Sequence, residues 1–237
     1  MEIKIVFNND VLNESFTAGW GFSCLVDGSI LFDTGERGEY LFSNMKLMDI
    51  DIIDIKAVVI SHDHWDHTGG LWEILKLKKG IEVYSCPGFS REFKEKVGKA
   101  GGILQEADEF VKVAENTYVT GEIAGRYKSN YIAEQALVIQ ADNSIIVITG
   151  CSHPGILRII EKVRQKFPKE KIKLAFGGFH LIDKDKREVK LIVEKLKVMG
   201  VEKAGPTHCS GYDAQIIFKQ SYGDKFISIK AGQVFEV

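Results

Sequence analysis

No hydrophobic run in this 237-residue sequence approaches the length needed to cross a membrane. The first residues, Met1 to Phe7, read as a strand and lack the apolar stretch of a signal peptide. Neither sign of charge dominates, since 31 lysines and arginines face 33 aspartates and glutamates. The sequence therefore predicts a cytoplasmic protein with a small-molecule substrate and no nucleic-acid or membrane partner, and it leaves the oligomeric state open.

Cysteine pairs at redox or zinc-finger spacing are also missing. The four cysteines, Cys24, Cys86, Cys151 and Cys209, are widely scattered, which favours reduced thiols over a disulfide framework. We expect Cys24 and Cys86 to be small core residues, whereas each of the other two lies within two residues of a histidine. The sequence has no Gly-x-Ser-x-Gly elbow, so nothing in it indicates a serine nucleophile.

Short β-branched runs alternate with helical patterns, and this alternation predicts an α/β or mixed layered fold. The expected strands are Ile3–Phe7, Phe22–Val26, Ile30–Phe32, Ala57–Ile60, Ile81–Tyr84, Val111–Val113, Ala136–Gln140, Ile145–Ile148, Lys173–Phe176 and Phe226–Ile229. The expected helices are Tyr40–Met48, Gly70–Leu77, Arg91–Lys99, Ile156–Lys166, Arg187–Met199 and Asp213–Gln220. In the fourth helix an apolar stripe at helical spacing predicts core packing and no function.

A weak internal echo links two segments of the chain. Residues 27–35 and residues 142–150 each read as a turn, an apolar strand and then Thr-Gly. One interpretation is that any hairpin leading into a loop looks like this. The other is a pseudo-twofold molecule whose two halves both contribute loops to one site.

All six histidines lie in predicted loops, where functional groups concentrate. The densest group is His62-x-His64-x-Asp66-His67, directly after an apolar strand. Because residues two apart in extended chain point the same way, His62 and His64 can hold one ion together. Asp66 and His67 are then available to a second ion, and imidazole with carboxylate suits zinc. A polar loop with incidental histidines is the alternative interpretation.

This motif resembles the hallmark of the metallo-β-lactamase superfamily. The resemblance implies an α+β fold, an αββα four-layer sandwich with two mixed β-sheets and helices on the outer faces. It also implies one domain over residues 1–237, with pseudo-symmetric halves of roughly 1–135 and 136–237. Two zinc ions per chain are expected, in preference to iron or manganese. Asp33, in Phe32-Asp33-Thr34-Gly35, matches the superfamily's first motif, where an aspartate orients a ligand histidine; the alternative is a turn aspartate.

The resemblance also assigns later residues, although the sequence departs from the usual pattern. Cys151 stands where a bridging aspartate is expected, and no histidine occurs between His67 and His153. His153 is therefore interpreted as the third ligand of the first metal and His208 as the last metal histidine. Cys151 is either a thiolate ligand of the second metal or a buried small residue.

Two further residues beside these ligands have open roles. His180 follows Gly177-Gly178, and the glycine pair indicates close backbone approach, with substrate as one candidate partner. We interpret His180 as a substrate-contacting or proton-donating residue in preference to a ligand or a capping residue. Cys209 points away from His208 in extended chain, which favours a supporting or structural role.

The favoured hypothesis is a metal-dependent hydrolase that uses zinc-bound hydroxide on an ester, phosphodiester or similar bond. A metal-bound water, Asp66 or His180 would then protonate the leaving group. The segments around Cys151, His180 and Cys209 resemble one branch in particular, the dihydropterin ribofuranosyl-aminobenzene-phosphate synthases. That resemblance implies a transferase as the runner-up. A non-catalytic metal-bound sensor is a third hypothesis, and a nuclease is disfavoured by the near-neutral charge.

Overall fold

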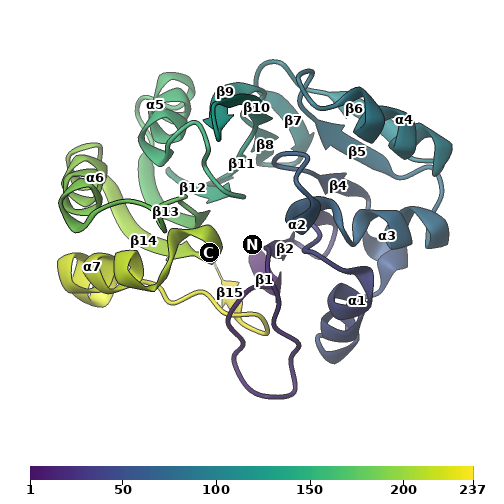
Figure 1. The fold of residues 1–237 in the computed structure, drawn as a ribbon, viewed down its shortest axis with the longest axis horizontal. Helices are drawn as coiled ribbons and strands as arrows, with labels where there is room; N and C mark the ends of the chain where they lie inside the picture. The colour runs from purple at the N-terminus through teal and green to yellow at the C-terminus, as the bar shows by residue number, and fades with distance from the viewer. Residues whose placement is uncertain (237) are drawn as a thin grey trace. The chain divides into compact units, whose positions relative to one another are not determined.

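The computed structural model describes residues 1–236, and these fold into two compact units. Unit 1 comprises the residues up to Glu109 together with the C-terminal segment from Lys230, and unit 2 comprises Phe110–Ile229. Each unit contains its own mixed β-sheet with helices packed on it (Figure 1). The predicted α+β class with two mixed sheets is confirmed.

Unit 1 is built on a seven-stranded sheet in the order β15-β1-β2-β3-β4-β5-β6. Its strands are β1 (Glu2–Phe7), β2 (Ser23–Val26), β3 (Ile30–Phe32), β4 (Ala57–Val59), β5 (Glu82–Ser85), β6 (Ile103–Glu106) and β15 (Val234–Glu236). Strands β3 to β6 run parallel, so their carboxyl ends lie at one edge of this sheet. Its helices are α1 (Gly38–Leu47), α2 (Trp65–Thr68), α3 (Leu71–Leu77) and α4 (Arg91–Lys99), with a 3₁₀ turn, η1, at Ile52–Asp54.

Unit 2 is built on a six-stranded sheet in the order β14-β13-β12-β11-β8-β7, with a separate β9–β10 hairpin. Its strands are β7 (Val111–Ala114), β8 (Thr117–Val119), β9 (Ile123–Tyr127), β10 (Asn130–Glu134), β11 (Leu137–Ala141), β12 (Ser144–Thr149), β13 (Lys171–Gly178) and β14 (Val201–Thr207). Its helices are α5 (Ile156–Lys166), α6 (Lys186–Val198) and α7 (Tyr212–Tyr222), with 3₁₀ turns η2 (His208–Ser210) and η3 (Gly223–Lys225). Figure 1 shows α5, α6 and α7 along one side of this sheet.

The core of unit 2 follows directly from sequence periodicity. The stripe Ile156, Ile159, Ile160 and Val163 is buried and belongs to one apolar cluster with residues of β12, β13, α6 and α7. Because β12 and β13 are parallel, the loops that follow their carboxyl ends leave the sheet at the same edge. The core packing predicted for this helix is confirmed.

The internal echo corresponds to a shared local topology. In unit 1 the turn at Asp27–Gly28 joins β2 to β3, which pairs antiparallel with β2 and parallel with β4. In unit 2 the turn after β11 leads into β12, which pairs antiparallel with β11 and parallel with β13. The same hairpin-then-parallel-strand arrangement therefore occurs once in each unit.

The strand predicted at Phe226–Ile229 is wrong. Phe226 forms only an isolated bridge to Ala204, because the chain has just left the η3 turn and continues without a ladder along β14. The β9–β10 hairpin has no counterpart in the sequence prediction, since exposed polar residues at its tip obscure the strand alternation. Within residues 1–236, none of the helices combines the length and apolarity that a membrane span requires.

Candidate metal centre

The histidine motif of unit 1 leaves the carboxyl end of β4 and enters the single turn of α2. His62 is fully buried, His64 occupies the residue before the first turn of α2, and His67 lies buried within it. The ring centroid of His62 lies 4.8 Å from that of His64 and 4.2 Å from that of His67. Asp66 Oδ2 lies 3.5 Å from His67 Nε2. The fold therefore brings the four donor residues of this motif together.

Asp33 supports this loop from the end of β3. Its Oδ1 accepts a hydrogen bond from the backbone N–H of Ser61 at 2.7 Å, and its Oδ2 accepts one from Ser61 Oγ at 2.8 Å. The same Oδ2 accepts from His67 Nδ1 at 2.7 Å. Since Nδ1 then carries the proton, the Nε2 atom of His67 holds the lone pair that a metal needs.

The tautomer of His62 is determined by a hydrogen bond in the same way as that of His67. Because the Ser61 hydroxyl proton points to Asp33, its oxygen accepts from His62 Nδ1 at 2.8 Å. His62 therefore also presents Nε2 as its lone-pair nitrogen. Burial raises the pKa of Asp33, although the charge and hydrogen bond of His67 and the hydrogen bonds from Ser61 act in the opposite direction. A buried carboxyl of this kind gains from a nearby cation.

The donors of unit 2 come from three loops that follow parallel strands. Cys151 and His153 follow β12, His180 follows β13, and His208 follows β14. One ligand atom each of Cys151, His153 and His180 lies within 4.8 Å of the others. His208 is buried at the start of η2. These loops are far apart in sequence but lie close together, because β12, β13 and β14 are neighbouring parallel strands.

Two of these histidines have strained backbone conformations. His180 and His208 have φ values of 51° and 50°, in the left-handed region that β-carbon sterics disfavour. Asp33 and Ser152 share this conformation, with φ values of 53° and 63°. Such strain costs on the order of 1 kcal/mol per residue and concentrates at functional sites.

Glu134 is a site residue that the sequence analysis missed. It ends β10, is fully buried, and its Oε1 accepts from the backbone N–H groups of Cys151 at 2.9 Å and Ser152 at 2.6 Å. Its Oε2 accepts from the backbone N–H of His153 at 2.7 Å and from His153 Nδ1 at 2.9 Å. His153 therefore presents Nε2 in the same way as His67 does. The available signal was a carboxylate between Ile132-Ala133 and the apolar run Ala136–Ile139, since carboxylates are rarely buried unless they are paired.

The charge on Glu134 is favoured in the folded protein. Burial alone would raise the pKa of this carboxyl, but the hydrogen bond and charge of His153 and the N–H groups of Cys151 and Ser152 lower the pKa below its ordinary value. Glu134 thus acts as an anion that fixes both the loop backbone and the ring of His153.

Cys209 and His180 interact with each other in unit 2. The Cys209 thiol is buried and donates to the carbonyl of Cys151 at 3.6 Å. Burial would raise its pKa, yet contacts with Cys151, His208 and His180 lower it well below the ordinary value. The pKa of His180 is raised, above all by its hydrogen bond to Cys209. The protonated form of His180 is therefore more populated near neutral pH than that of an isolated histidine.

The close backbone approach predicted for the glycine pair before His180 is confirmed, and the chain that approaches is the end of β12. A β-carbon on Gly177 would lie 2.0 Å from the carbonyl oxygen of Thr149. A β-carbon on Gly178 would lie 2.2 Å from the carbonyl oxygen of Gly150 and 2.7 Å from Cys209 Sγ. The pair allows β13 to approach the end of β12 closely.

Both units carry donor chemistry that fits zinc. Unit 1 offers three imidazoles and a carboxylate, and unit 2 offers imidazoles and a thiol. In each unit a buried carboxylate holds Nδ1 of a candidate ligand histidine, which is the arrangement that orients histidines on metals. The residues present therefore suit a metal whose ligands are nitrogen, oxygen and sulfur.

Three comparisons relate the chain to known proteins. The metallo-β-lactamase superfamily profile matches residues 22–113, which include the histidine motif. A curated relative from Methanocaldococcus jannaschii is 28% identical over 94% of this chain and 92% of its own length. It is named 7,8-dihydropterin-6-methyl-4-(beta-D-ribofuranosyl)-aminobenzene-5'-phosphate synthase.

Solved structures extend the match to the whole fold. A metal-dependent hydrolase of the β-lactamase superfamily superposes with a TM-score of 0.84 at 29% identity, covering 100% of this chain and 99% of that one. The metallo-β-lactamase fold protein YhfI from Bacillus subtilis gives a TM-score of 0.70 at 15% identity, covering 99% and 98% of the two chains, and shows the fold alone. The predicted metallo-β-lactamase type of fold is confirmed.

Proposed function

We propose that this chain is a member of the metallo-β-lactamase superfamily and a metal-dependent hydrolase of an ester, phosphodiester or similar small-molecule bond. The observation that carries the proposal is the pair of buried carboxylate–histidine contacts, Asp33 with His67 and Glu134 with His153. In each unit the buried carboxylate holds the Nδ1 proton of its histidine and leaves the Nε2 lone pair available. This arrangement is the one found around metal-binding histidines, and a purely structural histidine does not require it.

Seven residues are proposed to hold zinc, two ions per chain. They are His62, His64, Asp66, His67, Cys151, His153 and His208. When bound, zinc supplies Lewis-acid activation and a water whose pKa falls to about 7. Asp33 and Glu134 keep the Nδ1 protons of His67 and His153 in place, so that these rings need no rearrangement on binding.

His180 is proposed to donate the proton to the leaving group. Its pKa is raised through Cys209, so the imidazolium is populated closer to neutral pH than for an isolated histidine. His180 lies in the loop after β13, and its backbone has a left-handed conformation with φ of 51°. Its donor atom also lies within 4.8 Å of those of Cys151 and His153, so a role as a further ligand is the alternative.

One observation favours a second candidate function, a transferase that joins a dihydropterin diphosphate to an aminobenzene ribofuranosyl phosphate. The curated relative, similar over 94% of this chain, is named as a synthase of that product. The same donor residues would then stabilise a departing diphosphate in place of activating water. A non-catalytic metal-bound sensor is the third possibility.

Elemental analysis and a substrate panel test these functions together. We expect about two zinc per chain and chelator-sensitive cleavage of p-nitrophenyl esters or bis-p-nitrophenyl phosphate. Diphosphate release that requires both a pterin diphosphate and an arylamine would favour the transferase. A zinc-loaded protein inactive in both assays would favour the sensor, and a folded metal-free protein with full activity would refute metal dependence.

A further inference from the structure

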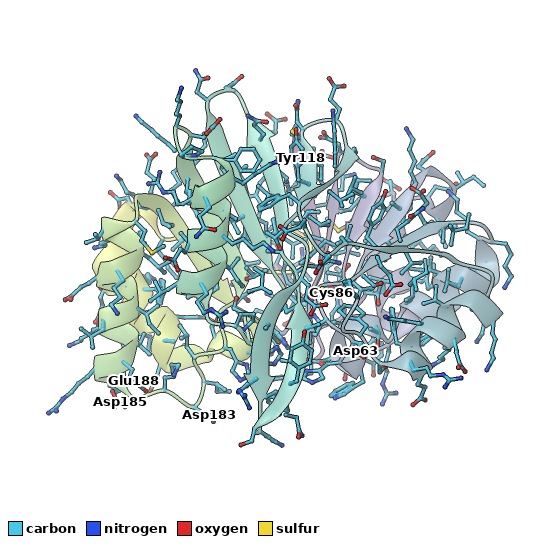
Figure 2. The ribbon with its side chains drawn as sticks, turned by 90° about the horizontal axis from the view of Figure 1, so that it is seen from above. Asp63, Cys86, Tyr118, Asp183, Asp185 and Glu188 are labelled. Atoms are coloured by element: carbon cyan, nitrogen blue, oxygen red, sulfur yellow. The ribbon has the colours of Figure 1, made fainter. Side chains whose placement is uncertain are left out.

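Unit 1 contains a cavity of about 440 Å³ that the proposed metal chemistry does not use. One of its walls is Trp65, the residue between His64 and Asp66 in the histidine motif. Asp63, labelled in Figure 2, lines it from the same loop. The volume lies in the range of small-molecule sites, roughly 300–1,000 Å³. The cavity is therefore large enough for a ring system beside the motif.

The aromatic walls of this cavity differ in how they are held. Trp72 is fixed by an edge-on contact with Phe93, with 5.8 Å between ring centroids, and by Lys96 Nζ at 3.7 Å from its ring centre. Trp65 is 60% exposed. The indole of Trp65 is therefore accessible for stacking against a ligand ring. Ordering this side chain costs little conformational entropy, because it has only two rotatable bonds.

Polar groups around the cavity are mainly acceptors. Three carboxylates, from Glu36, Asp63 and Glu92, line it against the single ammonium of Lys96. Asp63 Oδ2 accepts from the backbone N–H of Ser90 at 2.8 Å and Glu36 Oε1 from that of Trp20 at 3.1 Å. Each carboxylate has about four lone-pair positions, so capacity to accept from a ligand remains. The excess of negative groups disfavours an anionic ring.

We propose that this cavity binds the planar part of the substrate, a nitrogen heterocycle carrying N–H donors, stacked on Trp65. The indole provides the stacking face, and the carboxylates select N–H donors against unsubstituted or anionic rings. That the bound molecule is the substrate rests on the proposed function. The binding itself depends only on unit 1.

Calorimetric titration of the full chain with pterin tests this site, with 1-naphthoate as a ring of similar size that is anionic and lacks N–H donors. We expect pterin to give a saturable binding curve and 1-naphthoate to give none. Trp65→Ala should raise the pterin Kd about tenfold, the usual loss for one stacked ring. Trp20→Ala is the matched control, since Trp20 is an exposed tryptophan of the same unit that does not line the cavity. Glu92→Gln should narrow the preference for pterin over naphthoate.

Each titration is run on zinc-loaded and on chelator-treated protein, which separates the two proposals. Pterin binding retained by protein that shows no metal-dependent activity supports the cavity and counts against the proposed function. A zinc-loaded, active protein that does not bind pterin, or that binds naphthoate equally well, overturns the cavity assignment. An equal loss of pterin affinity in Trp65→Ala and Trp20→Ala overturns it as well.

Discussion

Replacing Glu134 by glutamine keeps the size of the side chain and removes its charge. The carboxylate accepts four hydrogen bonds, three from backbone N–H groups and one from His153 Nδ1, within a fully buried setting. The glutamine oxygen can still accept at Oε1, but its NH₂ group faces two donors of His153. Leaving both donors unsatisfied should cost about 2–6 kcal/mol, since each buried donor without an acceptor costs about 1–3 kcal/mol.

Zinc binding should weaken in the same variant. Without an acceptor at Nδ1, the proton of His153 is free to move to Nε2, the nitrogen proposed to bind zinc. Loss of such a supporting partner lowers metal affinity by about 10–100-fold. The assays are urea unfolding of the chelator-treated protein and zinc competition with a chromophoric chelator. Glu115→Gln, an exposed carboxylate of the same unit, is the matched control.

The stability effect should also depend on pH in a known direction. Because the folded pKa of Glu134 is lowered, its contribution is fully present above the unfolded pKa of about 4.3 and is lost as pH falls through the folded pKa. The stability difference between wild type and Glu134→Gln should therefore shrink only in acid. Equal unfolding and equal zinc affinity for the Glu134 and Glu115 variants would refute the reasoning.

Three further changes test other parts of the structure. Asp33→Asn should weaken zinc binding, which competition with a chelator measures. It should lower the free energy of unfolding of the metal-free protein less than Glu134→Gln does, because burial already disfavours the Asp33 charge; urea unfolding measures this difference. Gly178→Ala should destabilise the protein by about 1–3 kcal/mol, because the new β-carbon overlaps the Gly150 carbonyl. Gly98→Ala is the control: its β-carbon meets no atom, and the change should stabilise helix α4 by about 0.5–1 kcal/mol. Equal shifts of the melting temperature in the two variants would contradict this. His180→Gln should keep two zinc per chain, lower kcat about 10²–10⁴-fold and remove one limb of the pH profile, and loss of an ion would instead make His180 a ligand.

The sequence determined those features that depend on local pattern. The apolar stripe from Ile156 to Val163 follows from helical periodicity, and the structure places it in the core of unit 2. The spacing of His62, His64, Asp66 and His67 places four donors on one strand-to-helix loop, so their proximity could be predicted without knowing the sheet order. The two turn–strand–Thr-Gly segments likewise indicated the repeated hairpin topology.

Contacts between residues distant in sequence were decided only by tertiary structure. Glu134 meets His153 across 19 positions because the β9–β10 hairpin delivers its carboxylate to the loop after β12, and no periodicity encodes that meeting. The glycines at 177 and 178 were ambiguous for the same reason, since a close approach is visible in sequence but its partner is not. Local propensity and spacing thus specify which groups are available, whereas strand register specifies which buried anion orients which histidine.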